Sequence, residues 1–246
     1  MSWISRWRKR RREMRRLSEM RRSNVISEAA ARTEISVRGE GNAVEVDPSN
    51  DADCLSRVRI RIIGNGNRVT IGPRFNVRGC AEIDVTGEGN EVMIGSDVEI
   101  VDSLLLQILK NCRGGRVRIG SRCSFWRTEI RNYDTGSVTD VGEDCIFSFA
   151  TELRNTDEHT IFENGKVRNR GVRLALGRHC WIGYGASILK NSVVADGSIV
   201  GARAVVSGRF EKVRTILAGI PAKVIREDVD WDERSVNAFD GGANGD

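Results

Sequence analysis

Two histidines are the side chains of this 246-residue chain whose ordinary pKa lies close to neutral pH. A histidine can take a proton from an attacking hydroxyl and return it to a leaving group within one catalytic cycle. His159 lies in residues 154–161, where a regular sequence repeat is interrupted, whereas His179 lies inside that repeat, three residues after Leu176. We therefore expect proton transfer at His159 and a structural or ligand-side role for the outward-facing His179.

Two carboxylates, Asp157 and Glu158, directly precede His159. A carboxylate beside an imidazole can orient the ring, and it can also accept a hydrogen bond from a substrate hydroxyl. Adjacent acidic residues in a solvated loop are also common as simple surface charge. Both interpretations stay open at this point.

A six-residue repeat surrounds the histidines and predicts the elements that position them. Its period fits neither one helix face nor a single strand of plausible length, so it indicates short strands stacked as coils, with three hexads in each coil. The aliphatic positions of the repeat are Leu176, Ile182, Ile188, Val194, Val200 and Val206. Small residues four positions later are predicted to lie inside tight corners, and these are Cys180, Ala186, Ser192, Ser198 and Ala204.

A looser repeat continues upstream, where Gly-x-Gly-Asn at residues 64–67 recurs at residues 87–90. Its Ile/Val-Gly pairs at 71–72, 94–95, 119–120 and 141–142 are spaced more widely than three hexads, and we expect bulged corners to hold the excess. The next step, from Val141 to Leu176, is longer by nearly another coil. This excess predicts an inserted loop at residues 154–175.

Residues 177–183, 200–202 and 218–226 resemble the hexapeptide-repeat acyltransferases, most closely the bacterial capsule and surface-polysaccharide O-acetyltransferases. The resemblance implies an all-β, left-handed parallel β-helix over residues 33–226. It implies transfer of an acetyl group from acetyl-CoA to a sugar hydroxyl of a surface polysaccharide or its lipid-linked precursor. Because residues 154–161 are similar to the family's Arg-x-Ser/Thr-Asp-x-His segment, it also implies that His159 is the catalytic base, with Asp157 beside it.

The resemblance assigns a set of side chains to the acetyl-CoA donor, in which Lys223 and Arg226 would face the phosphates. The full donor set is Trp181, Gly183, Tyr184, Ala202, Ser207, Lys223 and Arg226. Candidate acceptor contacts are Trp126, by stacking on a sugar ring, and Asn132 and Asp134, by hydrogen bonds to hydroxyls. Phe125 lies near the place where galactoside and maltose acetyltransferases have an asparagine, which argues against those small sugars.

Other functions within the same fold stay open at this stage. An N-acyltransferase for an amino sugar or an amino acid differs in its acceptor and not in a residue that can be cited. A catalytically silent scaffold is a further alternative. A zinc-dependent carbonic anhydrase on the same prism needs three histidines for each site, and this chain has two, so we expect no metal.

The six cysteines contain no Cys-x-x-Cys pair. Cys123, Cys145 and Cys180 all stand four residues after a repeat aliphatic, so we predict buried packing residues in a reduced, cytoplasmic protein. The acidic tail, residues 227–246, is expected to be partly disordered.

Residues 1–24 contain ten Arg or Lys and two Glu, whereas the rest of the chain is slightly acidic. This asymmetry argues against nucleic acid as a partner of the main domain. Apolar residues recur at near-helical spacing among the cations, so residues 1–32 are predicted to hold a basic amphipathic helix and a linker. Such a helix could lie on an anionic membrane surface or cap an oligomer. The family resemblance implies a homotrimer with active sites at the subunit seams.

Overall fold

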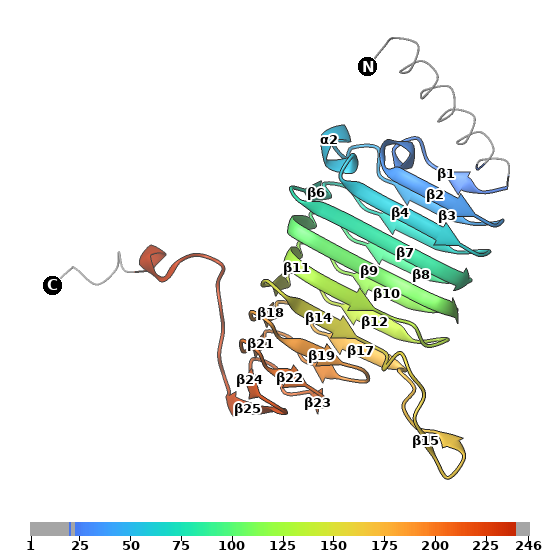
Figure 1. Cartoon of the computed structure of the whole chain (residues 1–246). Helices are drawn as coiled ribbons and strands as arrows, with labels where there is room; N and C mark the ends of the chain where they lie inside the picture. The colour runs from blue at the N-terminus through green and yellow to red at the C-terminus, as the bar shows by residue number, and fades with distance from the viewer. Residues whose placement is uncertain (1–19, 21–22, 240–246) are drawn as a thin grey trace.

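The structure, a computed structural model, describes Met20 and residues 23–239, and this part of the chain winds into a parallel β-solenoid (Figure 1). Each coil lies on the next through parallel strand pairing, which begins at β1 (Val25–Ile26). No helix among the described residues is long and apolar enough to cross a membrane. Residues 1–19 and 21–22, which carry the predicted basic helix, lie outside the described residues.

Strands from successive coils stack in register and form three walls. Within the described residues, one wall is a nine-stranded sheet of β1, β3 (Ala43–Val46), β5 (Arg68–Ile71), β8 (Glu91–Ile94), β10 (Arg116–Ile119), β12 (Val138–Val141), β17 (Arg173–Leu176), β20 (Val193–Val194) and β23 (Arg209–Phe210). The other two walls share a 14-stranded sheet of β2 (Glu34–Arg38), β4 (Val58–Ile63), β6 (Asn76–Val77), β7 (Cys80–Glu88), β9 (Glu99–Arg113), β11 (Ser124–Arg131), β13 (Ile146–Phe147), β14 (Thr151–Arg154), β18 (Trp181–Ile182), β19 (Ser187–Leu189), β21 (Ile199–Val200), β22 (Val205–Val206), β24 (Ile216–Gly219) and β25 (Ala222–Arg226). Short helices in the described part are η1 (Ala30–Arg32), α2 (Ala52–Leu55) and η2 (Val236–Ala238).

The register of the C-terminal coils confirms the hexad repeat. Ile182 pairs with Val200 and Ile188 pairs with Val206, so each aliphatic lies against the one three hexads later. All six repeat aliphatics are at most 3% exposed, and the five small corner residues are fully buried. Cys123 and Cys145 are buried in the same way and are free thiols, as predicted for packing residues.

The N-terminal coils are wider than the C-terminal coils (Figure 1). Pairing of Ile71 with Ile94, and of Ile94 with Ile119, confirms the upstream repeat. We had expected bulged corners to hold the extra residues of this repeat. Most of these residues instead lengthen one wall of the solenoid. There β7 has nine residues, whereas β19 and β22 of the same wall have three and two.

A buried asparagine ladder explains the Gly-x-Gly-Asn repeat. The Asn42 Oδ1 atom accepts hydrogen bonds from the backbone N–H and the side-chain Nδ2 of Asn67, both at 3.0 Å. Asn67 Oδ1 receives the same pair of bonds from Asn90, at 3.1 and 3.0 Å. Gly64 has a φ of +125°, and a Cβ there would stand 1.9 Å from the Gly87 oxygen, so the turn needs glycine.

The predicted insertion leaves the solenoid between β14 and β17. It contains an antiparallel hairpin of β15 (Phe162–Glu163) and β16 (Lys166–Val167), which projects from the edge of the solenoid (Figure 1). Beyond the last coil, β25 turns back antiparallel to β24, and the chain then runs along the outside of the solenoid. The histidine loop and this C-terminal segment give the two histidines different surroundings.

Candidate active site

His159 lies at the base of the inserted loop and lines a concavity of about 220 Å³. The concavity is formed by loop residues and by the preceding coil, including Tyr133, Asp134, Asp157, Asn169 and Arg170. The His159 side chain is exposed, and its imidazole makes no hydrogen bond with another described residue. A ring nitrogen is therefore free to accept a proton from a group that enters the concavity.

Glu158 anchors the start of the loop to the solenoid. Its Oε1 accepts hydrogen bonds from Arg131 at 2.9 Å and from Arg154 at 2.7 Å. The Lys110 Nζ donates to the Glu158 backbone oxygen at 2.7 Å. Burial acts to raise the pKa of Glu158, but the two arginines more than offset it and hold this pKa below its ordinary value. Glu158 is thus a charged anchor that binds arginines of the solenoid and not the imidazole.

Asp157 anchors the other side of the loop. Its carboxylate accepts hydrogen bonds from Lys190 Nζ and from Asn169 Nδ2, both at 2.8 Å. Burial acts to raise the pKa of Asp157, but these two donors lower it below its ordinary value. The Asp157 side chain makes no hydrogen bond with the His159 ring, so a direct role in orienting that ring stays a prediction.

Asp134 and Asn132, two of the predicted acceptor contacts, lie in different surroundings. Asp134 lines the concavity, where its carboxylate accepts hydrogen bonds from Thr156 Oγ1 and the Gly171 N–H. Asn132 is fully buried, and its amide bonds to Ser137 and Asn155 inside the solenoid. The prediction that Asn132 contacts a sugar does not fit this position, because its side chain is buried and its amide is bonded inside the solenoid.

Trp126, the third predicted acceptor contact, is not close to His159 in this chain. It is 41% exposed and packs against Phe149, with ring centroids 5.2 Å apart. Together with Trp181 and Trp231 it lines a separate groove of about 550 Å³. The structure therefore groups Trp126 with a residue of the predicted donor set.

The predicted donor residues do not gather around His159 within one chain. Trp181 lies on β18, Gly183 and Tyr184 follow β18, and Ala202 follows β21. Lys223 and Arg226 lie on β25. The loop hairpin projects from the opposite side of the solenoid (Figure 1). Ser207 is the exception in this set. It follows β22, which stacks on β19 and β14, so it lies at the corner from which the histidine loop leaves the solenoid.

The sequence is similar to those of known acetyltransferases, although no family model matches it. It is 27% identical over 198 residues to the polysialic acid O-acetyltransferase of Neisseria meningitidis, across 80% of this chain and 88% of that protein. It is 33% identical over 165 residues to the putative lipopolysaccharide biosynthesis O-acetyl transferase WbbJ of Escherichia coli K12, across 67% of this chain and 74% of that protein. The chain belongs to the hexapeptide-repeat O-acetyltransferases.

Solved structures of O-acetyltransferases share the fold. The polysialic acid O-acetyltransferase OatWY aligns with a TM-score of 0.60 and 24% identity, over 82% of this chain and 92% of that one. The polysialic acid-specific acetyltransferase NeuO aligns with a TM-score of 0.66 and 23% identity, over 82% of this chain and 90% of that one. The predicted left-handed parallel β-helix and the predicted enzyme class are both confirmed.

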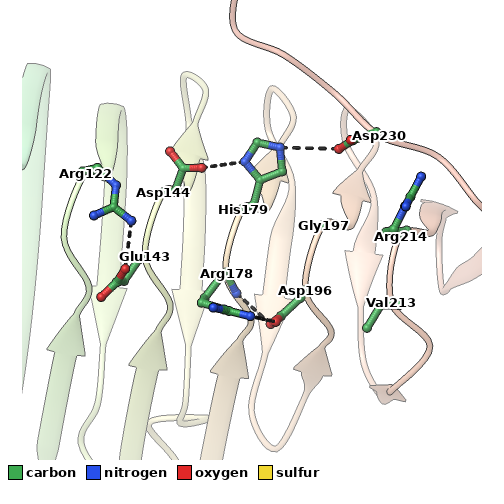
Figure 2. Close-up of a pocket in the computed structure, with 10 residues that line it drawn as sticks. All are labelled: Arg122, Glu143, Asp144, Arg178, His179, Asp196, Gly197, Val213, Arg214 and Asp230. Atoms are coloured by element: carbon green, nitrogen blue, oxygen red, sulfur yellow. Dashed lines mark hydrogen bonds and ion pairs between the residues drawn. The ribbon is translucent and has the colours of Figure 1, made fainter.

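In this O-acetyltransferase, His179 is the centre of a second pocket of about 430 Å³ at another corner of the solenoid (Figure 2). Its Nδ1 lies 2.7 Å from Asp144 Oδ2, and its Nε2 lies 3.1 Å from the Trp231 backbone oxygen. The Trp231 ring stacks on the imidazole at 4.2 Å, and its Nε1 donates to the His179 backbone oxygen at 2.9 Å. Both ring nitrogens of His179 are thus occupied.

The surroundings of His179 favour its protonated form. Burial acts to lower the pKa of His179, but hydrogen bonds to Asp144 and the Trp231 oxygen, and the charge of Asp230, raise it above its ordinary value. From the sequence, His179 was expected to have either a structural or a cofactor-side role. The contacts make it an anchor for the segment from Val229 to Trp231, which also bonds to Arg214.

Three residues that shape these two sites could not be predicted from the sequence. Trp231 lies 52 positions after His179, and a tryptophan in an acidic tail was its only signal. Lys190 and Asn169 fix Asp157, but neither belongs to a recognised motif. Among the described residues, no group of three or more His, Cys, Asp or Glu side chains is arranged to hold a metal ion.

Proposed function

We propose that this enzyme transfers an acetyl group from acetyl-CoA to a sugar hydroxyl, with His159 as the general base. The observation that carries the proposal is the free imidazole of His159 in a concavity lined by polar groups. His159 would take the proton of the acceptor hydroxyl while the hydroxyl oxygen attacks the thioester carbonyl carbon. The carbon–sulfur bond then breaks, and the imidazolium returns its proton to the departing thiolate.

The acceptor proposed here is a bacterial surface polysaccharide or its lipid-linked precursor. Two relatives support this choice, since one is named for polysialic acid and the other for lipopolysaccharide biosynthesis. The concavity is open and polar, and Asp134, Thr135 and Arg170 line it beside His159. Such groups can hydrogen-bond to sugar hydroxyls without enclosing the sugar, which suits one unit of a longer chain.

The donor set offers groups suited to acetyl-CoA. Lys223 and Arg226 are exposed, and neither forms an ion pair with another described residue, so both are available for phosphates. Trp181 and Tyr184 are 41% and 51% exposed and offer apolar surface to a pantetheine arm. The proposed donor is therefore a CoA thioester bound along the outside of the C-terminal coils.

A homotrimer would bring the two sets together. Within one chain the His159 loop and most of the donor set lie on opposite sides of the solenoid (Figure 1). A three-fold arrangement would place the loop of one subunit against the donor wall of its neighbour. We therefore expect a trimer in light scattering and active sites at the subunit seams.

Mixed trimers test the shared site. A His159→Ala chain and a Lys223→Ala/Arg226→Ala chain are each expected to have low activity. When the two chains are unfolded and refolded together, some seams join an intact loop to an intact donor wall, and activity should partly return. An active monodisperse monomer, or no return of activity in verified mixed trimers, would contradict the shared site.

The proposed location is the cytoplasm, with residues 1–24 contacting the inner face of an anionic membrane. Support comes from the sequence alone, since ten cations there at about 1 kcal/mol each would hold a trimer firmly. The measurement is vesicle co-sedimentation of the full chain beside a chain that starts at Asn24. Salt-sensitive binding of the full chain alone is expected, and equal binding of both chains would rule the anchor out.

The central experiment is an acetyl-transfer screen with acetyl-CoA and a panel of bacterial glycan repeat units, with mapping of the acetylated position. Formation of an ester on a glycan hydroxyl is the expected result. Amide formation on an amino sugar, or no transfer to any member of a broad panel, would count against the proposed acceptor. His159→Ala should abolish most of the transfer, while Arg168→Ala, which removes an exposed ion pair with Glu163 in the same loop, serves as the control.

A further inference from the structure

Asn169 contacts both sides of His159 along the chain. Its Nδ2 donates to the His159 backbone oxygen at 2.7 Å and to Asp157 Oδ2 at 2.8 Å. Its Oδ1 accepts from the Ile161 N–H at 2.8 Å. A single amide thus bonds to three points between Asp157 and Ile161, and the base lies in the middle of them.

The amide is linked to the solenoid through a charged bridge. Lys190, which follows β19 in the next coil, forms an ion pair with Asp157 at 2.7 Å. Asp157 in turn accepts the hydrogen bond from Asn169, and its backbone oxygen accepts from the His159 N–H at 2.6 Å. The Lys190, Asp157 and Asn169 side chains form a loop clamp between the next coil of the solenoid and the backbone at His159.

The chemistry of the clamp requires an asparagine at position 169. Asparagine offers two donors and an acceptor on one short planar group. An aspartate there could not donate to the His159 oxygen, and it would place a second negative charge beside Asp157. An alanine would remove the bonds to the His159 oxygen and the Ile161 N–H. It would leave the Asp157–Lys190 ion pair and the bond from the Arg168 N–H to the Ile161 oxygen in place.

We infer that Asn169 is the positioning residue that holds the catalytic base at the mouth of the concavity. This inference rests on the proposed function, in which His159 takes the acceptor proton. The imidazole has no partner of its own among the described residues, so its place depends on the backbone that carries it. A displacement of about 1 Å at a reacting group can cost on the order of a hundredfold in rate.

Asn169→Ala and Asn169→Asp should therefore lower kcat by about ten- to a hundredfold while KM for acetyl-CoA stays the same. Lys190→Gln removes only the far end of the clamp and should give a smaller loss of kcat. Arg168→Ala is the matched control, because Arg168 neighbours Asn169 but pairs with Glu163 outside the clamp. Its kcat is expected to equal that of the unaltered enzyme.

The two histidines allow a direct test of position. In enzyme with ¹³C-labelled histidine, the imidazole spectrum has one set of signals for His159 and one for His179. Asn169→Ala should shift or broaden the His159 signals and leave the His179 signals unchanged. Unmoved His159 signals, an unchanged kcat, or equal changes at both histidines would each overturn the inference.

Failure of the proposed function would look different. If His159→Ala keeps full activity, the base is elsewhere, whatever the spectrum of Asn169→Ala shows. If His159→Ala is inactive but Asn169→Ala keeps both its rate and its His159 signals, the base is right and the clamp is wrong. Lys190→Gln supplies the same readouts should Asn169→Ala fail to fold.

Discussion

The two histidines of this enzyme lie at different corners of one solenoid and have opposite surroundings. His179 stands in a regular hexad, and Asp144 and Trp231 occupy both of its ring nitrogens. His159 stands in an insertion, where the loop is held by its neighbours and the imidazole is left free. The His179 side chain is fixed by the preceding coil and by the C-terminal segment that packs on the solenoid. A side chain outside the repeat can be held by the backbone alone and keep its ring for chemistry.

The largest expected difference between the two histidines is in turnover. His159→Ala should lower kcat by about a hundredfold or more, because the acceptor hydroxyl loses its base. His179→Ala should change kcat far less, because its ring nitrogens are used for anchoring. Steady-state kinetics of the two folded variants measures this directly. Normal turnover of His159→Ala together with a dead His179→Ala would reverse the two assignments.

A smaller effect is expected when the C-terminal anchor is removed. Trp231→Ala removes the stacked ring and its hydrogen bond to the His179 oxygen, a contact worth about 1 kcal/mol. The Val229 N–H bonds to Arg214, so its hydrogen exchange reports on docking of the segment. We expect this exchange to become several-fold to tenfold faster. Val236→Ala, on an exposed side chain farther along the tail, is the control and should leave the Val229 rate unchanged.

The smallest expected effect is a pH dependence that belongs to His179. Its pKa is raised in the folded state, so the stabilisation from its charge is present at low pH and is lost as the pH rises through this pKa. Docking of Trp231 should therefore weaken as the pH rises above the His179 pKa. Tryptophan fluorescence and Val229 exchange across that range measure it, with His179→Gln as the control that removes the dependence. The same dependence in His179→Gln would assign it to another group.

The sequence could predict the features that follow the repeat and the place where the repeat is interrupted. The hexad aliphatics and corner residues were correctly placed because a period of six leaves few ways to bury them. The loop of His159 was found because the long step from Val141 to Leu176 breaks that period. The docking of Trp231 on His179 was missed because a contact between residues so far apart in the chain leaves no periodic signal.

Asparagine shows why residue type alone was misleading at the acceptor side. Asn132 has the polar groups of a sugar contact, but it is fully buried and accepts a hydrogen bond from Asn155 in the next coil. Trp126 lies with Trp181 in a groove on the wall of the donor set, so its predicted contact with the acceptor stays a prediction that depends on the subunit seam. A sequence gives the order of such residues along the chain, whereas the wall that each one occupies depends on the number of residues in every coil.

The asparagine ladder has an evolutionary consequence. Asn42 and Asn67 each accept a backbone and a side-chain hydrogen bond from the next asparagine of the ladder and donate the same pair to the preceding one. A whole coil, from one asparagine to the next, could therefore be duplicated or lost without leaving an unmatched polar group at the junction. The ladder would therefore tolerate a change in length of the N-terminal half in whole coils. The site around His159 lies in later coils, and its geometry would stay the same when such a coil is added or lost.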